Sequence, residues 1–363
     1  MSYIKKPVAR HPSLQPNALG LTVRDYEGAM STLCAGCGHD SITAAIVRAL
    51  FELDVPPHKL AKLSGIGCSS KTPTYFVSGA HGFNSAHGRM PAIATGANAA
   101  NRELMYIGVS GDGDSLSIGL GQMVHAMRRN VRMLYVIENN GVYGLTKGQF
   151  SASSDVGSKS KRGEANTQPP IDPALLALNI GATFVARSFS GDKAQLVPIL
   201  KAALRHDGFA LVDVISPCVT FNDHEGSTKS YVYTRKHQLP VVAADFVPAA
   251  DLVPSGDFVP HAEEITTSYA AGTVQTVRMH DGSVVRLHKV AADYDPTDRK
   301  AAWAYLEEHQ SKGQIPTGLL YLSESGSEMH AAAKTTKRPL VQLGYEELCP
   351  GSAALRELQD EYR

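Results

Sequence analysis

The stretch LMYIGVSGDGDSLSIGLGQMVHAMRRNVRMLYVIENN, residues 104–140, carries the clearest sign of the fold class. Residues 104–110 are an apolar run that predicts a strand, 117–129 predict a helix, and 131–138 predict a second strand. The alternation returns later in the chain, at 182–189, 193–205 and 209–215. Strands that alternate with helices are typical of a parallel sheet covered on both faces. The sequence therefore predicts a doubly wound, mostly parallel α/β fold.

The segments around this stretch divide the 363 residues into three predicted parts. Residues 1–30 show little periodicity and are predicted to form an N-terminal arm. Residues 31–237 hold the strand and helix patterns and are predicted to form one domain. Residues 238–363 are predicted to be a C-terminal extension, whose role the sequence does not reveal and in which 272–290 predict a hairpin.

Charge and hydropathy exclude several classes of protein. The chain has 35 basic and 35 acidic residues and no Lys/Arg-rich block, so no nucleic-acid partner is expected. A bilayer span needs about 18–20 uninterrupted apolar residues, and the best candidate, 42–53, is broken by Arg48. The first 16 residues lack the apolar stretch of a secretory signal. We therefore expect a globular, cytoplasmic protein that makes no membrane contact.

Polar residues follow both strands predicted within the central stretch. Gly111-Asp112-Gly113 ends the first strand, and after 25 further residues Asn139-Asn140 ends the second. Carboxyl ends of neighbouring parallel strands meet at one edge of a sheet, where such folds bind ligands. An acid and an amide there offer oxygen ligands to Mg²⁺, which often binds together with a diphosphate. The amino end of the helix near Ser117 would face that diphosphate.

Four of the five cysteines also lie near predicted strand or helix ends. Cys34 and Cys37 form a CxxC before a helix predicted at 40–53, Cys68 lies in a glycine-rich turn, and Cys218 ends the last parallel strand. Four thiolates can hold either tetrahedral Zn²⁺ or a [4Fe–4S] cluster. Because two of the four are single cysteines far apart in sequence, the cluster is favoured but not decided. No role is expected for Cys349.

These motifs together resemble a known family. The spacing from GDG to NN is similar to the thiamin diphosphate motif, in which the Asp, the second Asn and a backbone carbonyl two residues later bind Mg²⁺. The wider resemblance, over about residues 30–237, is to β subunits of 2-oxoacid:ferredoxin oxidoreductases. It is carried by CAGCGH (34–39), GIGCSS (65–70), HGRMPAIATG (87–96), GDGD (111–114), ENNGVYGLTKGQ (138–149) and SPCVTFN (216–222).

The resemblance implies the residues of a site. It assigns Cys34, Cys37, Cys68 and Cys218 to a [4Fe–4S] cluster, and Asp112, Asn140 and the carbonyl of Val142 to Mg²⁺. His87 matches a histidine that contacts the diphosphate. The other implied contacts of thiamin diphosphate are Gly67, Cys68, Ser69, Gly111, Gly113, Asp114, Asn139, Gly144, Leu145 and Thr146. Lys71 matches a position that reads the tail of the substrate, with Leu145 as a wall of the same pocket.

The implied activity is the oxidative decarboxylation of a 2-oxoacid, or its reversal, with coenzyme A and with ferredoxin as electron carrier. An ammonium group at Lys71 suits the second carboxylate of 2-oxoglutarate; pyruvate and branched-chain or aryl 2-oxoacids are the alternatives. A remote alternative is a scaffold with zinc on the four cysteines. The resemblance does not cover the pyrimidine-binding domain of thiamin enzymes, so an α subunit is expected to supply it within a heterotetramer.

Overall fold

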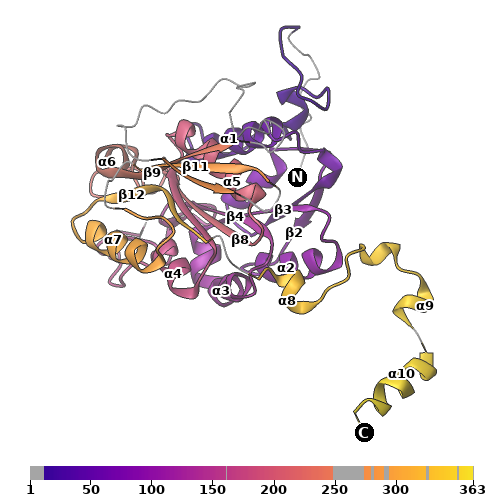
Figure 1. The fold of residues 1–363 in the computed structure, drawn as a ribbon. Helices are drawn as coiled ribbons and strands as arrows, with labels where there is room; N and C mark the ends of the chain where they lie inside the picture. The colour runs from indigo at the N-terminus through magenta and orange to yellow at the C-terminus, as the bar shows by residue number, and fades with distance from the viewer. Residues whose placement is uncertain are drawn as a thin grey trace.

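The computed structural model describes residues 12–160, 162–247, 274–278, 282–289, 294–323, 327–349 and 351–362. Figure 1 shows a sheet between two layers of helices, with the C-terminal end of the chain running away from this body. No helix in those ranges is both long and apolar enough to cross a membrane. The predicted doubly wound α/β fold is confirmed.

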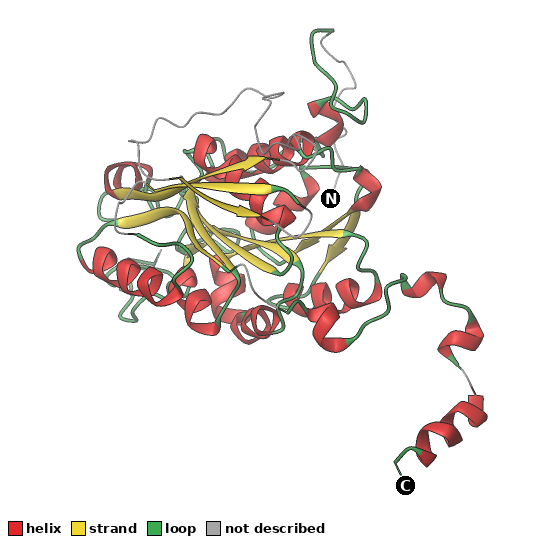
Figure 2. Ribbon diagram, in the orientation of Figure 1, coloured by secondary structure: helices red, strands yellow, loops and turns green. Residues whose placement is uncertain are grey.

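Ten strands form one sheet, drawn in yellow in Figure 2. From edge to edge they lie in the order β10 (Val274–Arg278), β11 (Val284–Lys289), β9 (Gln238–Val247), β12 (Ile315–Leu322), β7 (Phe184–Phe189), β8 (Phe209–Ile215), β4 (Met133–Asn139), β3 (Met105–Gly111), β1 (Leu60–Ser64) and β2 (His81–Asn84). The six strands from β7 to β2 are all parallel. Their carboxyl ends therefore meet along one edge, where this fold class binds ligands.

Helices cover both faces of the sheet. On one face α1 (Gly38–Glu52) packs against α5 (Lys193–Arg205). The other face carries α2 (Met90–Ala100), α3 (Leu120–Arg128), α4 (Pro173–Ile180) and α7 (Arg299–Ser311). Local sequence sets the ends of these helices: the side chain of Asp172 accepts a hydrogen bond from the N–H of Leu175 and caps α4, which ends at Gly181 in the left-handed conformation.

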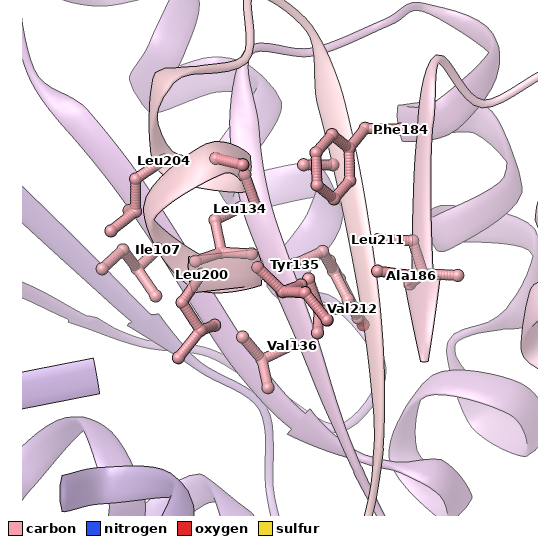
Figure 3. Packing of buried hydrophobic residues seen from close by; sticks show 14 of the residues in the cluster. Ile107, Leu134, Tyr135, Val136, Phe184, Ala186, Leu200, Leu204, Leu211 and Val212 are labelled. Carbon is pink, nitrogen blue, oxygen red and sulfur yellow. The ribbon is translucent and has the colours of Figure 1, made fainter. Parts of the chain in front are cut away.

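The central strands are buried on both faces, as expected for a parallel sheet between helices. All seven residues of β4 and all seven of β8 are buried. Figure 3 shows side chains from β3, β4 and α5 in one cluster, here Ile107, Leu134 and Leu200. Burial of each such side chain contributes about 1.5–3 kcal/mol. This core fixes the relative positions of the strand ends that carry the site.

The helix predicted at 117–129 corresponds to two elements. A π-helix, η4 (Gly113–Ile118), begins directly after Asp112, and α3 follows from Leu120 to Arg128. The first N–H groups of a helix have no partner within it. The amino end of this element therefore lies at the GDGD sequence itself, closer to the predicted site than expected.

The chain after residue 237 continues the same sheet. A short helix, α6 (Tyr231–His237), leads into β9, which pairs with β12, and β12 pairs with β7 of the preceding part. The hairpin predicted at 272–290 is present as the antiparallel pair β10 and β11, although its turn at 279–281 lies outside the described residues. The division into 31–237 and 238–363 stays a prediction, but the sheet does not stop at that boundary.

The two ends of the chain differ in how they meet this body. Of the predicted N-terminal arm, residues 12–30 are described, and Tyr26 is fully buried with its ring 5.9 Å from that of Phe51 in α1. At the other end, α8 (Met329–Ala333) lies against the body, and α9 (Tyr345–Leu348) and α10 (Gly351–Asp360) lead away from it (Figure 1). The N-terminal segment is therefore anchored, whereas the last residues project outward.

Candidate active site

Cys34 and Cys37 lie in a tight turn in front of α1. The N–H of Cys37 donates to the carbonyl of Cys34 at 3.0 Å, and Gly36 takes φ +81° at the third position, a conformation that glycine adopts without strain. The next residue, Gly38, packs against the segment after β8, because a Cβ there would lie 2.5 Å from the Oγ of Ser216. This close approach brings the CxxC turn beside the segment that carries Cys218.

The four cysteines predicted as cluster ligands line one cavity of about 200 Å³. Cys68 enters it from the turn after β1, and Cys218 from the segment after β8. A Cβ built on Gly144 would lie 3.5 Å from the Sγ of Cys68 and 3.6 Å from that of Cys218. The hydroxyl of Thr220 donates to the Sγ of Cys34 at 3.5 Å. The structure thus brings four cysteines from three separate segments to one cavity, and their binding of a cluster stays a prediction.

Four thiols can hold either one tetrahedral Zn²⁺ or an iron–sulfur cluster. Within the described ranges, no three His, Cys, Asp or Glu side chains are placed around a single point as one bound metal ion would require. Burial raises the pKa of Cys37 to about 12 and raises the pKa of Cys68, so both thiols stay protonated until a positive charge balances them. Cys349 is exposed on the outgoing C-terminal segment.

Asp112, at the end of β3, carries a buried carboxylate that is 1% exposed. Its Oδ2 accepts hydrogen bonds from the hydroxyls of Ser151 and Ser153, and its Oδ1 accepts one from the N–H of Asn140 at 3.4 Å. These donors are neutral, and burial raises the pKa of Asp112. Because a buried carboxylate is costly unless a cation balances it, Asp112 fits a bound metal ion. The surrounding oxygen atoms are the donors that Mg²⁺ prefers.

Asn140 and Val142 stand beside Asp112 on one wall of a second cavity. The side-chain oxygen of Asn140 accepts a hydrogen bond from the N–H of Val142 at 3.0 Å. Val142 begins β5 (Val142–Tyr143), which pairs with β6 (Gln149–Phe150) and so holds the turn in place. The three predicted Mg²⁺ ligands are therefore brought together.

Asn139 is the one predicted contact that faces elsewhere. Its amide nitrogen donates to the Oδ1 of Asp213 in β8 at 3.0 Å, and its oxygen accepts from the hydroxyl of Ser153 at 2.9 Å. It does not line the second cavity, whereas its neighbour Asn140 does. Asn139 is the last residue of β4 and Asn140 the first residue after it, and of the two only Asn140 lines the cavity.

Asp114 holds His87 at the same cavity. Its carboxylate accepts hydrogen bonds from the Nδ1 of His87, from the N–H of Gly88 at 2.8 Å and from the hydroxyl of Ser110 at 2.7 Å. Gly65 makes room for the carboxylate of Asp114, because a Cβ at position 65 would lie 2.1 Å from the Oδ2 of Asp114. Because Nδ1 faces the carboxylate, Nε2 is the ring nitrogen left for a ligand.

The second cavity, of about 50 Å³, is walled by the glycine-rich turns and by the start of β5. Except for Asn139, all the predicted thiamin diphosphate contacts line it: Gly67, Cys68, Ser69, His87, Gly111, Gly113, Asp114, Gly144, Leu145 and Thr146. It shares Cys68, Asn140, Gly144 and Leu145 with the cysteine cavity. The predicted cofactor site and the predicted cluster site are therefore adjacent.

Lys71 and Leu145 both line the cysteine cavity. The N–H of Lys71 donates to the carbonyl of Cys68 at 3.1 Å, which starts the short helix η3 (Ser69–Thr74). Leu145 is 47% exposed and belongs to both cavities. The structure thus brings these two residues to the junction of the cavities, and their contact with a substrate stays a prediction.

Two sets of residues at the site were not anticipated from the sequence. The first set is Ser151, Ser153 and Ser154, which are all buried, and the hydroxyls of the first two donate hydrogen bonds to the carboxylate of Asp112. Three serines within four positions, directly after β6, were the available signal.

The second set is a buried pair between the cysteine cavity and the sheet. The Nδ1 of His39 lies 3.4 Å from the Oε2 of Glu138, and the hydroxyl of Thr72 donates to the same carboxyl at 2.9 Å. Burial raises the pKa of Glu138 well above its usual value and lowers the pKa of His39 to about 4. Burial thus disfavours the charged form of both groups.

Comparison with known proteins agrees with this geometry. Residues 65–214 match the family described as "Thiamine pyrophosphate enzyme, C-terminal TPP binding domain". Those residues run from the turn after β1 to β8 and include both walls of the second cavity. The fold and the site together therefore define a thiamin diphosphate enzyme.

Individual proteins of similar sequence indicate which kind of thiamin diphosphate enzyme this is. The β subunit of a 2-oxoacid:ferredoxin oxidoreductase from Saccharolobus solfataricus is 44% identical over 207 residues, 57% of this chain and 67% of that one. The 2-oxoglutarate oxidoreductase subunit KorB of Mycobacterium tuberculosis is 42% identical over 217 residues, 58% of this chain and 57% of that one. The chain belongs to the β subunits of 2-oxoacid:ferredoxin oxidoreductases, and as a β subunit it has an α partner.

A solved structure extends the likeness to most of the chain. The structure is titled "2-oxoglutarate:ferredoxin oxidoreductase from Magnetococcus marinus with 2-oxoglutarate, coenzyme A and succinyl-CoA bound". The likeness covers 89% of this chain and 91% of that one, at 30% identity and a TM-score of 0.68. The fold predicted from the sequence is thus also that of a related oxidoreductase.

Proposed function

We propose that this chain and its α partner oxidatively decarboxylate 2-oxoglutarate with coenzyme A, or run the reverse carboxylation, with electrons passing through one [4Fe–4S] cluster to ferredoxin. The observation that carries the proposal is the shared wall of the two cavities at Cys68 and Gly144. An electron donor in one cavity and an acceptor in the other would lie on either side of this wall. A reducing cytoplasm suits such a cluster.

The cofactors supply chemistry that side chains lack: thiamin diphosphate stabilises negative charge on the former carbonyl carbon, and an iron–sulfur cluster accepts electrons one at a time. The chain would bind them with the groups described above. The four thiols would hold the iron, and Asp112, Asn140 and the carbonyl of Val142 would hold Mg²⁺. Asp114 fixes the ring of His87, so that Nε2 can meet a phosphate oxygen.

Lys71 would bind the second carboxylate of the substrate and so determine which 2-oxoacid is accepted. An ammonium group can pair with the second carboxylate of 2-oxoglutarate, which pyruvate and the branched-chain or aryl 2-oxoacids lack. Lys71 lines the cysteine cavity close to the junction residues Cys68 and Leu145. The names of the Mycobacterium and Magnetococcus relatives support the same substrate. The α partner would supply the activating glutamate and the contacts with coenzyme A.

The test is anaerobic purification of this chain with its α partner. We expect a brown complex with about four iron and four sulfide per β chain, and reduction of ferredoxin that depends on 2-oxoglutarate, coenzyme A and thiamin diphosphate. Cys68→Ser should lose the iron and the visible absorbance. Cys349→Ser is the matched control and should keep both, because Cys349 is exposed away from the cavity.

The outcomes separate the parts of the proposal. A colourless complex with one zinc per chain would refute the cluster and favour the scaffold. A brown complex that reduces ferredoxin faster with pyruvate would keep the cluster and refute the substrate. A complex whose melting temperature does not respond to thiamin diphosphate with Mg²⁺ would refute the cofactor site, since a ligand that binds only the folded state stabilises it.

A further inference from the structure

His39 is a buried histidine at the end of the CAGCGH sequence, in the first turn of α1. Its side chain is 1% exposed, and it lines the cysteine cavity together with Asn140. It belongs neither to the predicted cluster ligands nor to the predicted Mg²⁺ ligands. Its two ring nitrogens nevertheless face two different parts of the site, so the surroundings of each nitrogen indicate what the ring does.

The Nδ1 of His39 faces oxygen atoms. It lies 2.7 Å from the hydroxyl oxygen of Ser216 and 3.4 Å from the Oε2 of Glu138. The carboxyl of Glu138 is itself fixed by the hydroxyl of Thr72, which donates to it at 2.9 Å. Ser216 closely precedes Cys218 in the sequence, and Thr72 lies in η3. Segments that belong to the cysteine cavity therefore hold this side of the ring.

The Nε2 of His39 faces the side chain of Asn140. It lies 3.5 Å from the amide nitrogen of that side chain. An amide NH₂ group only donates hydrogen bonds, so Nε2 is the acceptor and carries no proton. The ring proton is then on Nδ1, where the oxygens of Ser216 and Glu138 can accept it. The contacts of both nitrogens thus agree on one neutral tautomer.

This tautomer determines which end of the Asn140 side chain faces His39. The oxygen and the nitrogen of an amide are alike in size, so their hydrogen-bond partners decide how the group is turned. With its nitrogen at His39, Asn140 turns its Oδ1 the other way, where it accepts from the N–H of Val142 at 3.0 Å. An amide oxygen has two lone pairs, so Oδ1 can accept this bond and also bind a metal ion.

The orientation matters because only one end of an amide can bind Mg²⁺. The ion takes oxygen ligands, whereas the NH₂ group offers only N–H donors. A rotated Asn140 would present its nitrogen in place of Oδ1 in the second cavity, which Asp112 also lines. Hydrogen bonds from surrounding side chains commonly fix metal ligands in this way. The ring of His39 is placed to make such a bond.

We propose that His39 is a positioning residue for the metal ion: it orients the side-chain amide of Asn140 so that the oxygen, and not the nitrogen, faces bound Mg²⁺. The inference rests on the proposed function in one respect, the binding of Mg²⁺ with thiamin diphosphate at Asp112 and Asn140. It goes further by assigning the orientation of a metal ligand to a side chain outside the ligand set.

The test is calorimetric titration of Mg²⁺ into the complex with its α partner, at saturating thiamin diphosphate. The amide of Gln reaches as far from the backbone as Nε2, and the amide of Asn only as far as Nδ1. His39→Gln can therefore still accept from Asn140 and should bind Mg²⁺ as the wild type does. His39→Asn keeps a partner for Ser216 but leaves the amide of Asn140 without its acceptor. Its Kd for Mg²⁺ should rise about 10- to 100-fold, the usual effect of losing a hydrogen bond to a metal ligand.

A second substitution identifies the orientation of the amide as the cause. Asn140→Asp presents an oxygen whichever way its side chain is turned, so adding it to His39→Asn should restore the binding of Mg²⁺. His330→Leu is the matched control, since His330 is also 1% exposed but lies in α8, where Met329 donates to the carbonyl of Asn130 ahead of β4. It should leave the Kd for Mg²⁺ unchanged, even if it lowers the melting temperature.

The outcomes separate this inference from the proposed function. Equal affinity for Mg²⁺ in His39→Gln and His39→Asn, compared at equal iron content, would overturn the role of His39, and so would a failure of Asn140→Asp to restore binding. Asp112→Ala reports on the metal site itself. If that variant loses Mg²⁺ while both His39 variants keep it, the proposed site stands and the inference is wrong. If the wild type binds no Mg²⁺ with thiamin diphosphate, both are wrong.

Discussion

The amide of Asn139 donates to the carboxylate of Asp213 at 3.0 Å, across two neighbouring strands and 74 residues of sequence. Arg187 donates to the other oxygen of Asp213 at 2.8 Å and pairs with Asp172 at 2.6 Å. In the opposite direction, Ser153 links Asn139 to Asp112. A continuous buried network thus connects the carboxylate predicted to bind Mg²⁺ with the interior of the sheet.

From this network we expect substitutions of Asn139 and of Asn140 to have different effects. Asn139→Ala removes the hydrogen-bond donor to the Oδ1 of Asp213 and one acceptor of the Ser153 hydroxyl, so the free energy of unfolding should fall by about 1–3 kcal/mol. Asn140→Ala should change stability less but weaken the binding of thiamin diphosphate with Mg²⁺ at least tenfold. Urea unfolding and calorimetric titration measure the two effects. Equal losses of stability in both variants would contradict this division.

Gly144 should be essential for the iron content of the chain. A methyl group there would occupy space 3.5 and 3.6 Å from the sulfurs of Cys68 and Cys218, where the cluster must fit. Gly144→Ala is expected to lower iron per chain at least several-fold. The matched control is Gly121→Ala in α3, where an added Cβ has no atom within 4 Å. If the Gly144→Ala chain kept its full iron content, the cluster would have to be bound elsewhere.

Lys71 should set the choice of substrate. Loss of a charged hydrogen bond to the second carboxylate costs about 1.5–3 kcal/mol, so Lys71→Ala should raise the KM for 2-oxoglutarate roughly 10- to 100-fold and leave pyruvate turnover unchanged. Lys159→Ala, a change of an exposed lysine in the loop 151–170, serves as the control. Steady-state ferredoxin reduction measures both. An unchanged preference in Lys71→Ala would remove this residue from the substrate pocket.

Lys62 should make stability depend on pH. Its ammonium group is buried in β1, donating to the carbonyls of Phe76 and Val77 at 2.6 and 2.8 Å, and burial lowers the pKa of Lys62 from 10.5 to about 8. The folded chain therefore binds fewer protons than the unfolded chain between pH 8 and 10.5, and this group adds stability as the pH rises through that window.

The expected gain is on the order of 1–3 kcal/mol. It is isolated by comparing the wild-type chain with Lys62→Met in urea unfolding at pH 7.5, 9 and 10. As the pH rises, the unfolding free energy of the wild-type chain should increase relative to that of Lys62→Met. A difference that stays constant with pH would show that Lys62 keeps an ordinary pKa in the fold.

The sequence by itself determined the class of the fold and most of the residues that the structure brings to the two cavities. Strand and helix periods, together with the residues that follow each strand, are local properties, so residues 104–140 were sufficient to predict two parallel strands and the position of Asp112 at an edge. The CxxC and the glycine-rich turns are short motifs whose residue types and spacing can be recognised directly in the sequence. For these reasons the four cysteines and the residues around Asp112 could be named without coordinates.

Only the tertiary structure decided which side chains of those motifs face each other. Asn139 and Asn140 are the same residue type in sequence, but Asn139 at the end of β4 bonds Asp213, whereas Asn140 just after the strand lines the cavity. Ser151 and Ser153 meet Asp112 only because the chain after β6 returns to the carboxyl end of β3. The strands after residue 237 join the sheet through pairings between distant segments. Local periodicity does not encode such contacts, because they depend on the packing of the whole core.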